Sequence, residues 1–260
     1  MKTTTMKAAL AATLALGLGQ AAQADLSLNG AVGLPLNPTA QVPAPGGIRL
    51  QGNYYDGGSA GAGNTKYVGL VAAGSLSPNL EISGGMTRLS GAGAGVDKTG
   101  VAIGAKYLFT RESDPAGVRL AVGAGYAQAM LRNTNVYAVA TKFIPLGDDK
   151  LPLTGSLGLR YDAWDLVPGG AGGKDNKLSI FAGAEVPLSR TGDVHFVAEL
   201  GTKNATGASS PYSVGLRYRP AGRPFGASVG YQRQGVFSTG GLYAQIGYTW
   251  ATGGDASAAK

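Results

Sequence analysis

The chain has 260 residues, and its 22 lysines and arginines against 15 aspartates and glutamates give a formal net charge of +7. The basic residues are scattered along the sequence, which excludes the concentrated basic surface of a nucleic-acid-binding protein. There is no cysteine, so a disulfide framework and a thiolate metal site are excluded as well.

The first residues have the composition of a secretory signal peptide. Lys2 and Lys7 supply positive charge, Ala8–Gly19 is an apolar stretch, and Ala22-Gln23-Ala24 fits the small-x-small cleavage pattern. The apolar stretch is well short of the ~20 residues that a membrane-spanning helix requires, which disfavours an N-terminal anchor. We therefore predict that the mature chain begins at Asp25.

The segment that follows, residues 25–46, lacks the pattern of a strand. Its Asn-Gly pair, its repeated prolines and its terminal glycines all interrupt regular pairing. Asn37 followed by Pro38 fits a helix N-cap with proline at the first helical position, so a short helical turn is predicted there. The sequence leaves open whether the segment is an unstructured leader or a plug of the domain that follows.

From Ile48 to Trp250 the chain repeats segments of about ten residues in which apolar residues alternate with polar or small ones. A period of two is typical of a β-strand with one apolar face. Strands are predicted at residues 47–55, 66–76, 79–89, 100–109, 118–127, 136–144, 151–163, 177–187, 194–202, 212–219, 224–233 and 241–250. In the sixth predicted strand, the apolar residues Val136 and Ala138 are placed on the polar face, so the alternation is less distinct there.

The connections alternate in length, because those after odd-numbered segments are mostly long and rich in Gly, Asn and Ser. Strands of about 9–11 tilted residues with such connections are typical of transmembrane β-barrels. We therefore predict an all-β fold, an antiparallel up-and-down transmembrane β-barrel of about 12 strands, in preference to a soluble β-sandwich. The longer connections are predicted at residues 56–65, 90–99, 128–135, 164–176, 203–211 and 234–240.

Aromatic residues gather at both ends of the predicted strands, as expected for the two membrane interfaces. At the end where the first strand begins they are Tyr107, Phe109, Phe143, Phe196, Tyr218, Phe225 and Trp250. At the opposite end they are Tyr54, Tyr126, Tyr137, Tyr161, Tyr212 and Tyr231.

With its signal peptide, alternating segments and terminal aromatic strand, the chain resembles bacterial outer-membrane β-barrel proteins of the porin-like type over residues 47–250. The stretch Gly33-Leu34-Pro35-Leu36-Asn37-Pro38-Thr39-Ala40, with Gly46-Gly47, also resembles the start of YjbH-type outer-membrane proteins. The resemblance implies a bacterial outer-membrane location, with membrane lipid and the barrel-assembly machinery as partners. Many such barrels end on the aromatic strand, whereas this chain continues past Trp250.

Four regions are predicted on this basis: a signal peptide at 1–24, a periplasmic leader or small plug at 25–46, the barrel at 47–250, and a flexible tail at 251–260.

Charged residues fall on the polar face of the predicted strands, which places them in the lumen of the barrel. They are Arg49, Glu81, Lys106, Arg119, Arg160, Asp162, Glu185, His195, Glu199 and Arg217. Neighbouring strands are about 4.8 Å apart, so two clusters are predicted. One joins Glu81, Lys106 and Arg119, and the other joins Glu185, His195 and Arg217. These clusters act either as a constriction that selects solutes by charge or as ion pairs that fill the lumen.

The function predicted from this pattern is a narrow passive pore for small hydrophilic solutes. The alternative is a closed structural or envelope-anchoring barrel that binds a partner through its loops or leader. A membrane-embedded lipid hydrolase is disfavoured, because the single histidine, His195, lies at the wrong end of its strand for a site near the outer leaflet. We predict no enzymatic activity, no catalytic residue, no cofactor, no metal site and no nucleic-acid partner.

Overall fold

A computed structural model describes the greater part of the chain. The predicted signal peptide, nearly all of the predicted tail and parts of the predicted loops lie outside the described residues. The described ranges are 25–57, 66–91, 97–114, 117–129, 131–145, 153–165, 173–189, 191–235 and 240–251.

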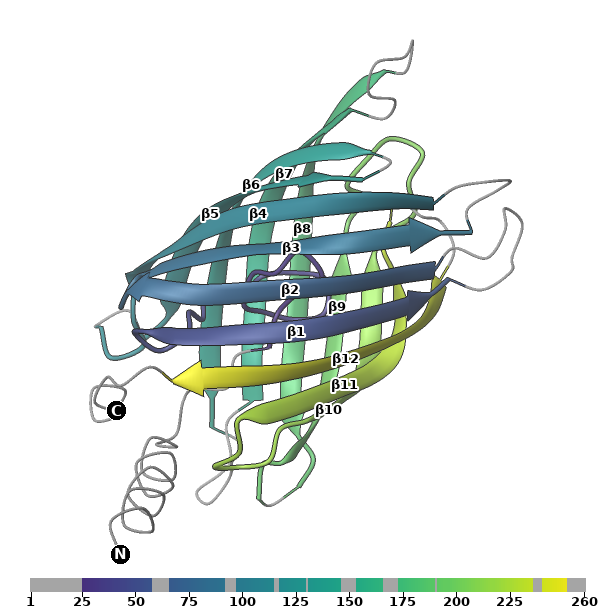
Figure 1. Cartoon of the computed structure of the whole chain (residues 1–260). Coiled ribbons are helices and arrows are strands. Elements are labelled where there is room, and N and C mark those ends of the chain that lie inside the picture. Colours follow the sequence, from purple (N-terminus) through teal and green to yellow (C-terminus); the bar gives the residue numbers. More distant parts are fainter. Residues whose placement is uncertain are drawn as a thin grey trace, which may run out of the picture.

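Twelve antiparallel strands form one closed barrel (Figure 1). Each strand pairs with its neighbours in sequence, and the ring closes between the first strand and the last. This confirms the predicted fold class and excludes the two-sheet sandwich. The strands are β1 (Gly47–Asp56), β2 (Lys66–Ser77), β3 (Leu80–Ser90), β4 (Asp97–Thr110), β5 (Arg119–Gln128), β6 (Arg132–Ile144), β7 (Leu153–Asp165), β8 (Lys174–Pro187), β9 (Val194–Gly201), β10 (Tyr212–Tyr218), β11 (Phe225–Arg233) and β12 (Gly240–Ala251).

Burial alternates along the strands as the sequence pattern predicts. In β7, for example, Leu157 is 59% exposed while its neighbour Ser156 is 8% exposed. Large hydrophobic side chains such as Leu70, Ile103 and Leu242 cover the outside of the ring, and polar side chains line its inside. An apolar exterior around a polar interior is the arrangement of a barrel that meets lipid. Within the described ranges, no helix combines the length and the apolar character needed to cross a bilayer.

The connection between β5 and β6 is much shorter than predicted. The predicted loop at residues 128–135 extends too far, because β6 already begins at Arg132. Asn133 and Asn135 are strand residues that point inward, where Asn133 Nδ2 donates to Asp162 Oδ1 at 3.0 Å. Asparagine favours turns in soluble proteins, but in a polar lumen its amide finds partners on a strand.

The same strand corrects two placements of aromatic residues. Tyr137 is buried inside the barrel, with its ring over Gly123 of β5, and Val136 is the residue that faces outward. Phe143 also lies on the inward side, because it shares the alternation of Tyr137, and its ring centre is 4.8 Å from the guanidinium of Arg119. Ala138 faces outward with Val136, so neither blurs the polar face.

The other aromatic residues predicted for the interfaces occupy outward positions, and their contact with the membrane stays a prediction. At the end where β1 begins, Tyr107 packs against Phe109, with 5.0 Å between ring centres, and Tyr248 packs against Trp250, with 4.6 Å between ring centres. The outward set is Tyr54, Tyr107, Phe109, Tyr126, Tyr161, Phe196, Tyr212, Tyr218, Phe225, Tyr231 and Trp250.

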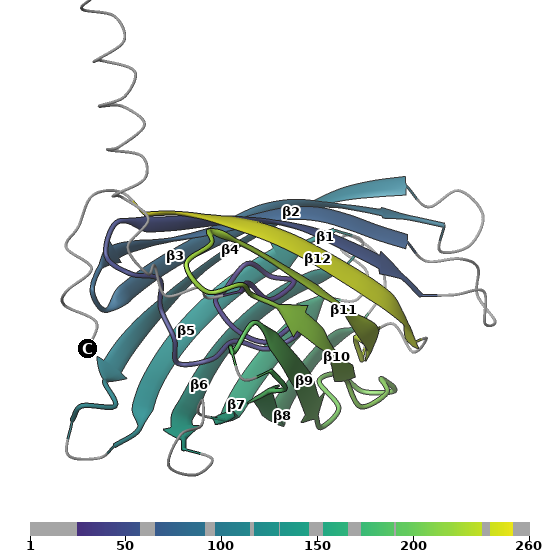
Figure 2. The ribbon, with the colours of Figure 1, turned by 90° about the horizontal axis from the view of Figure 1, so that it is seen from below.

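Residues 25–46, here called the inner segment, lie inside the ring of strands (Figure 2). Two isolated bridges fold the segment on itself, Leu26 with Val32 and Gly33 with Pro38. The predicted helical turn after Asn37 is wrong, because Pro38 takes part in the second bridge instead. Four of its apolar side chains are almost completely buried: Leu26, Val32, Leu34 and Ala40.

Candidate functional site

The candidate site is the lumen, where the inner segment meets the barrel wall. Apolar contacts hold it at two places. Leu26 and Val32 cluster with Val71 and Ala73 of β2, and Ala40 packs into a second group of buried residues on the opposite side. That second group comprises Leu108, Ala121, Tyr137, Val139 and Phe181.

Polar side chains of the wall bind the backbone of the inner segment. Gln51 of β1 both accepts from the Leu26 N–H, at 3.1 Å, and donates to the Leu26 carbonyl, at 2.7 Å. The backbone of Val32 is bound in the same two-sided way, because Glu81 accepts from its N–H at 3.0 Å and Lys106 donates to its carbonyl at 3.0 Å. These bonds satisfy backbone groups that form no regular strand or helix.

The far side of the lumen contributes two more attachments. Thr141 of β6 accepts a hydrogen bond from the Ala40 N–H at 2.9 Å. Glu199 of β9 accepts from the Leu36 N–H at 2.7 Å and from Asn37 through both its backbone and its side chain. The inner segment is therefore bonded to strands on opposite sides of the ring.

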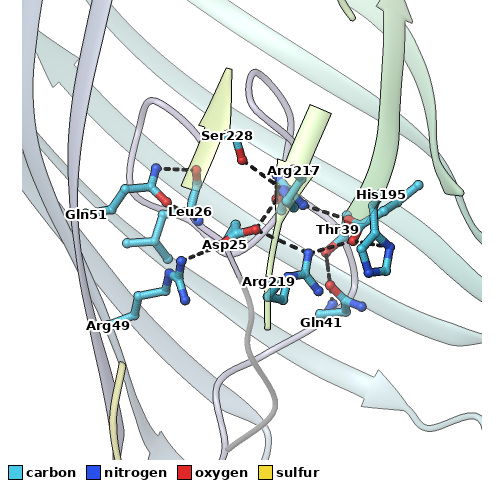
Figure 3. A network of polar contacts seen from close by, with 12 residues as sticks. Asp25, Leu26, Thr39, Gln41, Arg49, Gln51, His195, Arg217, Arg219 and Ser228 are labelled. Atoms are coloured by element: carbon cyan, nitrogen blue, oxygen red, sulfur yellow. Dashed lines mark hydrogen bonds and ion pairs between the residues drawn. The ribbon is translucent and has the colours of Figure 1, made fainter. Parts of the chain in front are cut away.

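The first residue of the inner segment lies among three arginines (Figure 3). Arg217 Nε is 2.6 Å and Arg219 Nη2 is 3.2 Å from Asp25 Oδ2, while Arg49 donates to Asp25 Oδ1. Glu185 contacts the same cluster, because its two oxygens accept from Arg217 at 2.7 Å and from Arg219 at 2.6 Å. Three guanidinium groups thus face two carboxylates inside the barrel.

The Asp25 carboxyl stays ionised despite its burial. Burial by itself would raise its pKa, but the positive charges of Arg217, Arg49 and Arg219 outweigh that effect and hold the pKa below its usual range.

The structure brings together most of the residues predicted to line the lumen. Glu81 and Lys106 form an ion pair at 2.8 Å, and Arg160 and Asp162 form another at 2.9 Å. The predicted cluster of Glu185, His195 and Arg217 also forms, with His195 Nδ1 at 3.1 Å from Glu185.

The placement of Arg119 beside Glu81 and Lys106 is wrong. Lys106 lies opposite Gly123 on β5, so Arg119 is displaced along the strand toward the rim. There its partner is Glu112, at 3.7 Å. The register of the β4–β5 pair sets this displacement, and position near a strand end does not reveal that register.

Several residues of the site were not predicted. Asp25 was identified only as the start of the mature chain. Arg219 falls on the polar face of the predicted strand 212–219 but was not counted among the lumen residues, and in the structure it lies just past the end of β10. Gln51 and Thr141 lie at inward-facing positions of the alternating pattern, which could have identified them. They were missed because only charged residues were assigned to the lumen. The sequence signal for Asp25 was a carboxylate in a segment that otherwise contains no charged residue before Arg49.

A second space borders the inner segment, and neither Asp25 nor the three arginines around it line this space. It is a cavity of about 170 Å³ bounded by Leu36 and Asn37 of the inner segment and by the wall residues Asn133, Arg160 and Trp164. The Trp164 indole N–H donates to the Asn204 carbonyl at 2.8 Å, which fixes the ring at the edge of this cavity.

Nothing in the described ranges assembles a metal site, since no group of three or more His, Cys, Asp or Glu side chains comes together. The imidazole of His195 is engaged with Glu185 and, through Nε2 at 2.6 Å, with the Gly192 carbonyl. Both ring nitrogens of His195 are therefore engaged, one by the Glu185 carboxylate and the other by the backbone of Gly192.

Comparison with known proteins gives the fold a context. No protein-family profile matches the chain, and no curated protein matches it. Among solved structures the chain is similar to the KdgM porin, with a TM-score of 0.51 at 14% identity, covering 80% of this chain and 99% of that one. It is similar to the NanC porin with a TM-score of 0.51 at 13% identity, covering 79% and 99%. At such low identity the likeness concerns the fold, and the chain shares the closed barrel of these outer-membrane porins.

Proposed function

We propose that this chain is an outer-membrane barrel that acts as a narrow passive pore for small hydrophilic solutes, and that the inner segment closes it in the conformation described. The observation that carries the proposal is the set of bonds from the inner segment to opposite walls, through Gln51, Glu81, Thr141 and Glu199. The likeness in fold to two porins supports the same function.

The chemistry of these bonds supports reversible closure. Each bond between a wall side chain and the inner segment is modest: those of Gln51 and Thr141 are worth roughly 0.5–1.5 kcal/mol net, and those of the charged Glu81, Lys106 and Glu199 about 1.5–3 kcal/mol. Water can replace either partner once the lumen is hydrated. The wall behind the inner segment is polar, with Gln51, Asn53 and Gln245 facing inward, so it would hold water after the segment leaves.

Conductance across a planar lipid bilayer tests the proposal. The mature protein is expected to conduct weakly, and a variant that lacks residues 25–46 is expected to conduct strongly. Removal of residues 252–260, which follow β12 in the sequence, serves as the control for shortening the chain. A silent bilayer for all three proteins would overturn the pore.

A silent bilayer would instead favour the second candidate, a closed structural or anchoring barrel. One observation speaks for it: the inner segment is bound by both apolar and polar contacts, as a permanent filling would be.

Location and processing belong to the same proposal. The protein is expected to fractionate with the outer membrane, and mass spectrometry of the membrane-bound form is expected to find Asp25 at the N-terminus. Cysteines at Gly61 and Gly172 should react with an impermeant maleimide on intact cells, whereas one at Asp148 should not. An intact Met1 would contradict the processing, and the reverse labelling would contradict the orientation.

A further inference from the structure

The arginines around Asp25 are held in place by the barrel wall as well as by Asp25. Arg49 Nη1 donates to Thr249 of β12 at 2.9 Å, and Arg217 Nε lies 3.2 Å from Ser228 Oγ on β11. Arg217 and Arg219 also share Glu185. The three guanidinium groups therefore keep these partners when the inner segment moves away.

The wall also leaves room for what the arginines bind. Two inward-facing glycines border the cluster. A side chain at Gly247 would collide with Arg49, with its Cβ 2.6 Å from Nη2, and one at Gly226 would lie 3.4 Å from Asp25 Oδ1. The absence of a side chain at Gly247 leaves room for the Arg49 guanidinium, and its absence at Gly226 leaves a recess that the Asp25 carboxylate occupies.

The positive charge of the three arginines around the recess favours a bound anion. Without Asp25, three guanidinium groups would face Glu185 alone, and an arginine does not shed its proton in a protein. A buried excess of positive charge is costly. Both oxygens of Asp25 are engaged by guanidinium groups, Oδ1 by Arg49 and Oδ2 by Arg217 and Arg219, and such charge-assisted contacts are stronger than those between neutral groups.

We infer that Arg49, Arg217 and Arg219 form a binding site for carboxylate-bearing solutes, and that Asp25 is its tethered occupant. This inference rests on the proposed pore, for which it names a substrate class. A carboxylate solute that enters the lumen competes with Asp25 for the arginines and thereby favours the release of the inner segment.

Calorimetric titration of the detergent-solubilised mature barrel tests the site without any need for conductance. The probes are succinate, its neutral analogue butane-1,4-diol, and inorganic phosphate. Asp25→Asn removes the tethered charge, so this variant is expected to bind succinate at least about tenfold more tightly than the wild type, because an intramolecular competitor acts at millimolar or higher effective concentration. Butane-1,4-diol should not bind, and phosphate should bind more weakly than succinate.

Two further variants give the matched controls. Asp97→Asn removes a carboxylate that pairs with Arg88 at an exposed position outside the lumen, so its titration should equal that of the wild type. Arg219→Gln in the Asp25→Asn background should abolish the gain, and heat-modifiable gel mobility verifies that this barrel is folded. Equal succinate affinity in wild type and Asp25→Asn, or phosphate binding as tight as succinate, would overturn the inference.

The bilayer experiment separates this inference from the proposed pore. If the variant lacking residues 25–46 conducts but the titrations of wild type and Asp25→Asn coincide, the pore stands and the carboxylate site fails. If that variant is silent and Asp25→Asn still binds succinate more tightly, the site stands and the pore fails. If both hold, succinate should also raise the open probability of the wild type, and butane-1,4-diol should not.

Discussion

Glu199 holds Asn37 through two hydrogen bonds, although 162 positions separate the two residues. The Glu199 carboxylate accepts from the Asn37 backbone at 3.1 Å and from its side-chain amide at 2.9 Å, and it also accepts from the Leu36 N–H at 2.7 Å. One wall side chain thereby takes up three donors of the inner segment. It lies on β9, whereas Asp25 is bound mainly from β1 and β10.

Glu199→Gln should weaken closure without harming the barrel. The amide keeps one acceptor oxygen in place of two, so at least one of the three donors loses its partner. A hydrogen bond to a charged group is worth about 1.5–3 kcal/mol, which predicts a rise of roughly tenfold or more in open probability in planar bilayers. Asp97→Asn is the control, and an unchanged open probability in Glu199→Gln would contradict the role of this contact.

Two neighbouring residues on β7 should respond differently to the same substitution. Leu157→Arg places a charge on the lipid-facing side at a cost of about 2–4 kcal/mol, so the folded fraction in heat-modifiable gel mobility should fall. Ser156→Arg points into the lumen, where Ser156 Oγ lies 2.9 Å from the Thr141 hydroxyl that binds Ala40. This barrel should still fold, but the larger side chain should displace the inner segment and raise conductance. Equal folding defects would contradict the assigned faces.

Acid should open the barrel through Asp25. A released Asp25 has an ordinary pKa of about 3.9, and the bound carboxyl has a lower pKa because of Arg217, Arg49 and Arg219. The stabilisation from the bound carboxylate is therefore present above about pH 4 and is lost as the pH falls below that value.

The measurement for this prediction is open probability as a function of pH, compared between the wild type and Asp25→Asn. Glu185 faces the same cluster in both proteins, so the difference between the two curves belongs to Asp25. Parallel curves would contradict the prediction.

Leu34 and Gly183 offer a test by paired substitution. A Cβ on Gly183 of β8 would collide with the Leu34 side chain of the inner segment. Gly183→Ala should therefore raise conductance. Leu34→Ala in the same protein should restore closure in part, because it removes the Leu34 atoms, whereas the Glu199 Cβ at 2.9 Å and the Ala198 carbonyl oxygen at 3.0 Å remain. Gly173→Ala is the control, since nothing lies within 4 Å of its Cβ position. Failure of Leu34→Ala to compensate would show that the first substitution acts on the wall.

The sequence was sufficient to predict the barrel but not to predict which side chains and which segment fill its lumen. Alternation is a local property, and Leu157 beside Ser156 displays it within two residues, so the strands and their number could be predicted. Tyr137 and Phe143 were misplaced because an aromatic side chain also packs inside a barrel, against a glycine or an arginine of the next strand. Their identity alone does not distinguish lumen from lipid.

The lumen depends on register, which is not local. Arg119 was assigned to the wrong partners because its place near a strand end does not define its pairing, and the register of the β4–β5 pair sets Lys106 opposite Gly123 instead. The cluster around Asp25 draws on β1 and β10, with Arg219 just beyond the latter, and their convergence follows from closure of the whole ring. Residues 25–46 show no repeating pattern of apolar and polar residues, so their contacts with the barrel wall could not be predicted from the sequence.

The seam between β1 and β12 bears on the order of assembly. Arg49 and Thr249 meet there across 200 positions, so the backbone of β1 is fully paired only after the last strand has been made. An unpaired edge is costly in hydrocarbon, and contacts between residues far apart in sequence form slowly. A chain that stops before β12 would therefore have no stable inserted form, and biogenesis of this barrel depends on its final twelve strand residues, Gly240–Ala251.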